Sequence, residues 1–92
     1  MSEIRLEFPT AKTSIEEVRP VLDQALHEEF PGGMMKSHWE GDVLHLTGPG
    51  ARGTVELHDG KVVGQATLKP PASLMRPVIE KKMTQVLSRA AG

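Results

Sequence analysis

An antiparallel hairpin is encoded in Trp39-Glu40-Gly41-Asp42-Val43-Leu44-His45-Leu46, where two alternating runs of residues flank the pair Gly-Asp. Glycine and aspartate accept the backbone conformations of tight turns, so Gly41-Asp42 is expected to reverse the chain. The alternation of apolar and polar residues extends over residues 34–68, with a second turn pair at Asp59-Gly60. A period of two over this length predicts a meander of four antiparallel strands.

The expected meander has one apolar face and one mostly polar face, which is typical of an antiparallel sheet with one side in water. His38, His45 and Glu56 fall on the polar face, and Val63 is an apolar residue there. Gly64 falls on the apolar face, where the missing side chain permits close approach of a helix or marks a bulge. The apolar face is formed by Met35, Ser37, Trp39, Leu44, Leu46, Val55, Leu57, Val62, Gly64, Ala66 and Leu68.

A strand and a helix precede the meander. Residues 4–8 alternate between apolar and charged side chains, which predicts a half-buried strand. Thr13 or Ser14 then caps a helix with an apolar stripe of helical period, and Ser14 with Glu17 fits a capping box. Pro20 lies inside this helix and is expected to kink it or to reset its start.

A second amphipathic helix follows Pro70-Pro71. Ser73 is expected to cap this helix, and Pro77 lies in or near its first turn, where proline is tolerated best. The apolar stripe that should pack on the sheet comprises Leu74, Met75, Val78, Ile79, Met83, Val86, Leu87 and Ala90.

These elements predict an α+β fold in the order strand, helix, four-stranded meander, helix. Both helices need an apolar surface to cover and the sheet offers one, so we expect a two-layer sandwich with both helices on that face. The length allows one domain, residues 1–92. The core is poor in aromatic residues, with one Trp, two Phe and no Tyr. Because the sheet also has open edges, we expect a homodimer that pairs through residues 4–8 or near Val63.

Composition argues against several classes of function. Lys plus Arg is 11 and Asp plus Glu is 12, a net charge of −1 that argues against binding to nucleic acid through phosphate attraction. The absence of cysteine excludes disulfides and thiolate metal sites. No apolar stretch is long enough to span a membrane and no secretory signal is visible, so we expect a cytoplasmic location. No constellation of catalytic residues stands out, and we expect neither enzymatic activity nor a cofactor.

His38 and His45 are the strongest candidates for a metal site. If Gly41-Asp42 forms the turn, the two histidines lie opposite each other on neighbouring strands, with their Cβ atoms about 5 Å apart. Glu56 is expected on the same face of the next strand, and two imidazoles with a carboxylate can bind zinc or a similar ion. The alternative, and the simpler interpretation, is a solvated sheet face on which the histidines have no special role.

The methionines indicate a second kind of site. Met34, Met35, Met75 and Met83 are expected to fill irregular gaps between the helices and the sheet. The alternative is an adaptable apolar groove, lined by Met35, Trp39, Met75 and Met83, that binds an acyl or hydroxyacyl group. Trp39 is more readily explained as a core anchor, because it lies on the apolar face.

Three motifs carry a family resemblance. The first is the segment 39–46, with a tryptophan, an acidic residue, Gly-Asp and then apolar residues. The second is Gly53-Thr54-Val55-Glu56-Leu57, and the third combines Leu68-Lys69-Pro70-Pro71 with Ile79-Glu80-Lys81-Lys82. Together they resemble the polyhydroxyalkanoic acid system proteins, a small bacterial family named for genes found near polyester-granule genes. The resemblance covers nearly the whole chain and implies a link to polyhydroxyalkanoate storage, but its motifs are structural and imply no catalytic residue.

In that setting, the positive charge on the last helix gains a possible role. Arg76, Lys81, Lys82 and Arg89 would let an amphipathic helix lie on a granule or membrane surface, although such charges also simply solvate an exposed face. Our leading hypothesis is a non-enzymatic accessory protein that binds a granule component or a partner protein. The alternative is a small-molecule or metal-binding domain that uses the apolar groove or the face with the two histidines.

Overall fold

The expected order of elements is found in a computed structural model, which describes residues 2–33 and 35–92. Met34, which was expected to fill a gap in the core, lies outside the described residues. The strands are β1 (Ser2–Pro9), β2 (Lys36–Glu40), β3 (Val43–Gly48), β4 (Ala51–His58) and β5 (Lys61–Leu68). The helices are α1 (Ile15–Glu29) and α2 (Arg76–Ala91), and the 3₁₀ turn η1 (Ala72–Met75) leads directly into α2.

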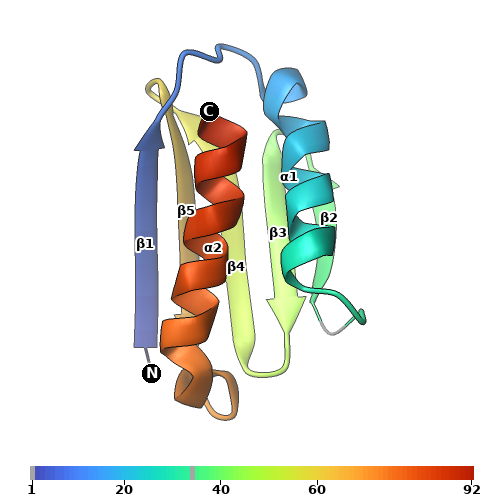
Figure 1. Ribbon diagram of the computed structural model, residues 1–92, viewed down its shortest axis with the longest axis vertical. Helices are drawn as coiled ribbons and strands as arrows, with labels where there is room; N and C mark the ends of the chain where they lie inside the picture. The colour runs from blue at the N-terminus through green and yellow to red at the C-terminus, as the bar shows by residue number, and fades with distance from the viewer. Residues whose placement is uncertain (1, 34) are drawn as a thin grey trace.

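The described strands form one antiparallel sheet in the order β1-β5-β4-β3-β2 (Figure 1). The strand β1 joins the meander beside its last strand, so β1 and β2 are the two outer strands. The predicted meander and its register are confirmed, because His38 lies opposite His45 and Trp39 lies opposite Leu44.

Tight turns set the register of two hairpins. The β2–β3 hairpin turns at Gly41-Asp42, where Gly41 has a φ of 62°. The β4–β5 hairpin turns at Asp59-Gly60, whose φ angles are 51° and 73°. Positive φ at both central residues of Asp59-Gly60, and at the first central residue of Gly41-Asp42, matches the twist of the flanking strands. These turns therefore determine which face of the sheet each side chain occupies.

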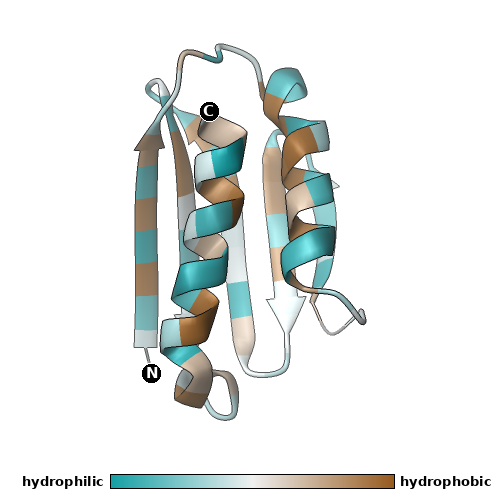
Figure 2. Ribbon diagram, viewed as in Figure 1, coloured by the Kyte–Doolittle hydropathy of each residue, from teal (hydrophilic) through white to brown (hydrophobic). Residues whose placement is uncertain are grey.

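Both helices cover the same face of the sheet, which confirms the predicted two-layer α+β sandwich (Figure 1). Figure 2 shows hydrophobic and hydrophilic residues alternating along β1, as expected for a strand with one buried side. The main core lies between the helices and the sheet, and its buried residues are Val18, Leu22, Ala25, Leu26, Leu44, Leu46, Val55, Val62, Met83, Val86, Leu87 and Ala90. We call the other side of the sheet the open face.

Gly64 allows α2 to approach β5 closely, as its place on the apolar face predicted. A Cβ atom built on Gly64 would lie 2.6 Å from Cδ1 of Leu87, and Leu87 is fully buried. A side chain at this position would therefore collide with the helix layer.

The start of α1 is partly as expected. Ser14 is the N-cap, and its Oγ accepts a hydrogen bond from the N–H of Glu16 at 3.2 Å. The predicted return bond from the Glu17 side chain is not found among the described residues. The expectation that Pro20 resets the helix start is wrong, because α1 begins before Pro20 and continues beyond it. Buried residues on both sides of the proline hold the helix against the sheet.

The start of α2 differs from the prediction. Ser73 lies within η1, and Met75 is the N-cap of α2 without a side-chain capping bond. Pro77 is in the first turn, as expected. Leu74, Met75 and Val78 are exposed instead of forming part of the buried stripe. For Leu74 and Met75 the reason is that they belong to η1, and a 3₁₀ turn has three residues per turn, so its side chains are out of register with the α-helical stripe. Val78 lies in α2 itself, outside the stripe of Met83, Val86, Leu87 and Ala90 that the helix buries.

Trp39 is half-buried on the outer strand β2 and packs at the margin of the core. Its indole Nε1 donates to Oδ1 of Asp23 at 3.0 Å, and the guanidinium of Arg19 lies 4.5 Å from the ring centroid. The aromatic ring thus fastens β2 to α1 through a hydrogen bond and a cation–π contact. Trp39 therefore anchors the edge of the core and does not lie at its centre.

Candidate functional site

An apolar pocket opens at one end of the helix layer, between the end of α1, the β3–β4 turn and the start of α2. Its volume is about 390 Å³. The lining is dominated by apolar side chains and consists of Glu29, Phe30, Pro31, Met35, Gly48, Pro49, Ala51, Pro71, Ala72, Met75, Val78, Ile79 and Lys82. Concave apolar surfaces of this kind are typical of binding sites.

Three large apolar side chains are exposed where η1 leads into α2, and we call them the apolar patch: Leu74, Met75 and Val78. Their exposed fractions are 79%, 52% and 44%. Met75 and Val78 line the pocket, and Leu74 directly precedes Met75. Figure 2 shows hydrophobic residues at the lower end of the helix layer, where η1 leads into α2. Neighbouring apolar residues left in water are a common mark of an interaction surface.

The four residues expected to line a groove do not all meet. Met35 and Met75 both line the apolar pocket. Met83 is buried below it, beside a small void of about 10 Å³ that also touches Met35 and Ile79. Trp39 does not line the pocket and instead contacts α1. Sequence periodicity therefore located the methionines near one another, but it grouped Trp39 with them only because all four share the apolar layer.

Two of the cationic residues singled out on α2 are near the pocket and are held by the chain itself. Lys82 donates from Nζ to the carbonyl of Glu29 at 2.7 Å, and its Nζ lies 5.7 Å from the Phe30 ring centroid. Arg76 pairs with Glu80 at 3.5 Å. Both side chains are therefore held by contacts within the chain rather than extended freely into water.

The remaining two cationic residues differ in their surroundings. Arg89 donates to Glu28 at 2.7 Å, close to the other end of α2. This hydrogen bond from Arg89, with a second from Gln24, holds the pKa of the Glu28 carboxyl below its ordinary value. Lys81 is exposed, and no ion pair is found for it within the described part of the chain. Lys81 is thus the cation of this group best placed to meet an outside partner.

The open face carries the predicted histidine pair. The rings of His38 and His45 stack with centroids 5.3 Å apart and an interplanar angle of 18°. The nearest carboxylate to His38 is that of Glu40, with 3.7 Å between Nε2 and Oε2. His45 lies opposite Thr54 on β4, and Glu56 is two residues further along that strand. In residues 2–33 and 35–92, no group of three or more histidine, aspartate or glutamate side chains is placed to hold a metal ion.

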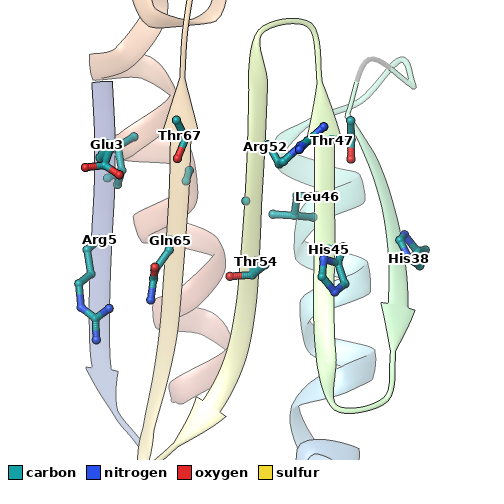
Figure 3. Close-up of a pocket in the computed structure, with 13 residues that line it drawn as sticks. Glu3, Arg5, His38, His45, Leu46, Thr47, Arg52, Thr54, Gln65 and Thr67 are labelled. Carbon is teal, nitrogen blue, oxygen red and sulfur yellow. The ribbon is translucent and has the colours of Figure 1, made fainter. Parts of the chain in front are cut away.

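A shallow hollow of about 800 Å³ crosses the open face (Figure 3). It contains a transverse row of side chains, one from each strand: His38, His45, Thr54, Gln65 and Arg5. These groups offer hydrogen bonds, whereas the lining of the pocket beside the apolar patch is almost wholly apolar. The apolar patch and its pocket are therefore the stronger candidate for a docking site.

The fold and these surfaces define a small two-layer α+β protein with one bare sheet face and an exposed apolar patch at one end. A family model for polyhydroxyalkanoic acid system proteins matches residues 4–90. The chain belongs to this family. A comparison with curated proteins finds no match. The family assignment links the chain to the polyhydroxyalkanoate system and confirms the resemblance found in the sequence.

Periodicity assigned Leu74 and Val78 to the buried stripe, so the exposed patch was missed. A signal was nonetheless present, because Pro70, Pro71 and Pro77 enclose the segment 72–76. Prolines this close together restrict the backbone on both sides, and a regular α-helix cannot extend through them toward the N-terminus. Prolines in this arrangement therefore predict a separate turn before the helix instead of a first helical turn. No helix in the described residues is long and apolar enough to cross a membrane.

Proposed function

We propose that this protein is a non-enzymatic accessory protein of polyhydroxyalkanoate storage in the cytoplasm, and that it attaches to the polyester granule through the apolar patch. The observation that carries the proposal is the exposure of Leu74, Met75 and Val78 beside an apolar pocket. Membership of the polyhydroxyalkanoic acid system family supports the choice of polymer.

The chemistry of the patch suits an aliphatic polyester. Such a polymer presents alkyl groups and ester carbonyls but no ionised groups along its chain. Leu74 and Val78 would bury apolar surface against the alkyl groups, which is favourable in proportion to the area removed from water. The ammonium of Lys81 can donate to ester carbonyls at the edge of the contact. This combination favours a polymer surface over a strongly charged partner.

Binding to washed polyhydroxybutyrate beads tests the proposal directly. Burying an exposed leucine or valine side chain contributes about 1.5–3 kcal/mol, and about 1.4 kcal/mol is a tenfold change in affinity. The double variant Leu74→Ser/Val78→Ser should therefore bind at least about tenfold more weakly. Gln24→Ser/Gln65→Ser is a matched control at exposed polar positions on α1 and β5, and it should bind like the wild type.

The outcome that contradicts the proposal is equally clear. Wild-type protein that does not bind the beads, or that binds them as well after both serine substitutions, would exclude attachment through the patch. The same variants fused to a fluorescent protein should then show whether the chain gathers at granules in polyester-accumulating cells or stays diffuse.

The apolar pocket favours a second candidate function, the binding of a single acyl or hydroxyacyl group. Its volume of about 390 Å³ and its apolar lining suit one alkyl chain. Native mass spectrometry of the purified protein with a soluble hydroxyacyl thioester separates the two functions. Retention of one ligand per chain, together with loss of bead binding in its presence, would favour the pocket as the primary site.

A further inference from the structure

The strand β2 is an open edge of the sheet. It pairs with β3 on one side and has no strand beyond it among the described residues. Figure 3 shows His38 on this outermost strand, at the margin of the open face. An edge strand of this kind presents unpaired backbone N–H and C=O groups that can pair with another strand.

The side chains that β2 directs toward the open face have a self-complementary charge pattern. Lys36 and Glu40 have opposite charges and are each two residues from His38. All three residues are exposed. Within the described part of the chain, no ion pair is found for Lys36, and Glu40 lies near only His38, at 3.7 Å. The two charges are thus available to a partner.

We propose that two copies of this chain associate through β2, paired antiparallel about His38. In this register, Lys36 lies opposite the partner's Glu40, and Glu40 lies opposite the partner's Lys36. Opposite charges directly across an antiparallel pair are stabilising, and the two-fold symmetry forms both pairs at once. The result is one continuous sheet with β2 of each subunit at its centre.

The same register also suits the other positions of the strand. His38 lies opposite the partner's His38, so the stacked pair with His45 continues as a row of four imidazoles across the two subunits. On the helix-covered face, Ser37 lies opposite the partner's Trp39, and a small residue opposite a large one leaves space for the indole ring. With the imidazoles neutral, no position in the pairing brings two like charges opposite each other.

The other outer strand is less suited to this role. It ends at Pro9, which has no N–H to donate to a partner strand. Its Glu7 already accepts from Arg5 at 2.9 Å and from Lys61 at 3.4 Å. Arg5 and Glu7 at the middle and end of β1 are therefore paired within the chain, whereas Lys36 of β2 has no ion pair among the described residues and Glu40 lies near only His38. This contrast favours β2 over residues 4–8. The other contact expected from the sequence, Val63, is buried on the inner strand β5 and offers little surface to a partner.

The charge pattern of β2 favours a second copy of the same chain as the binding partner. A strand from another protein would place opposite charges against Lys36 and Glu40 only by chance. A second copy paired about His38 always does so, because the two-fold symmetry brings each lysine opposite a glutamate. Since β2 has five residues, the interface is short and the dimer should be weak. Association is therefore best measured at high-micromolar concentration.

Sedimentation velocity across a concentration series tests the proposal. Lys36→Glu places two glutamates opposite each other twice, and Glu40→Lys does the same with lysines, so each variant should dimerise about tenfold more weakly. The double variant Lys36→Glu/Glu40→Lys restores opposite charges in the reversed order and should recover dimerisation. Arg5→Glu reverses a charge on the other outer strand and should leave dimerisation unchanged.

Circular dichroism and thermal melting confirm that each variant is folded. A wild-type chain that remains a monomer at high-micromolar concentration would overturn the proposal. So would single variants that dimerise normally, a double variant that fails to recover, or a dimer that is lost in Arg5→Glu but kept in Lys36→Glu.

Discussion

The contact between Gly64 and Leu87 can be tested with a single added methyl group. In Gly64→Ala, the new Cβ would lie 2.6 Å from Cδ1 of Leu87, well inside van der Waals contact. Leu87 is fully buried between α2 and the sheet, so its side chain has little room to move away. The substitution should therefore push α2 away from β5 or force Leu87 into a strained rotamer.

The size of the effect follows from two opposing terms. Overpacking a well-filled core costs roughly 1–3 kcal/mol. Replacing glycine by alanine within a strand returns about 0.5–1 kcal/mol, because alanine loses less conformational freedom on folding. The free energy of unfolding should therefore fall, by up to about 2.5 kcal/mol. In a small domain this is a large share of the total stability.

Urea denaturation of four variants provides the measurement. Leu87→Val removes the Cδ1 atom that the new methyl group would meet, at a cost of about 1 kcal/mol. In the Leu87→Val background, Gly64→Ala should then lose its overpacking cost and become slightly stabilising, so the two changes should be strongly non-additive. Gln65→Ala, at the exposed neighbouring position, serves as a control with little expected effect. Additive costs, or a Gly64→Ala variant more stable than the wild type, would refute the close-approach argument.

Two further predictions concern titratable groups. Because the described residues place only two imidazoles together, zinc at pH 7.5 should not raise the melting temperature; a rise that disappears in His45→Ala would instead establish a metal site. Glu28 has a pKa below its ordinary value through its hydrogen bonds to Arg89 and Gln24. Its contribution to stability is therefore present above the ordinary carboxyl pKa and is lost as pH falls through the lowered value. NMR titration should show the Glu28 pKa rising in Arg89→Ala; an unchanged pKa would contradict the pairing.

Much of the sheet was predictable from the sequence, because short segments of sequence determine its turns and strand register. The pairs Gly41-Asp42 and Asp59-Gly60 specify two turns, and a two-residue turn determines the register of the strands on either side. The opposition of His38 and His45 followed from that register alone. The close approach at Gly64 was also predictable, because only a helix or a bulge explains glycine on a buried face.

The position of β1 and the exposed patch were harder to predict, because both depend on contacts distant in the sequence. The sequence of residues 4–8 predicts a strand but does not determine whether this strand pairs with β5 or with β2. The spacing of Leu74 and Val78 fits a helical stripe, but the helix begins only at Arg76, so Leu74 precedes it and Val78 is in its first turn. Trp39 was predicted as a core anchor from its face, yet its place on an outer strand leaves it half-buried.

The two proposals, taken together, bear on how such a small protein could hold onto a granule. A two-fold axis between paired β2 strands runs perpendicular to the sheet, so the helix layers of both subunits remain on the same side. The apolar patches, at the start of each α2, then lie at opposite ends of one elongated helix-bearing surface. A polymer surface that meets this side can engage both patches at once, and the second contact forms at high effective concentration. Even a weak dimer would thereby bind the polymer more tightly than one subunit with a single apolar contact. Binding to the polymer would in turn favour dimerisation, because any ligand that binds the dimer better than the monomer shifts the equilibrium toward the dimer.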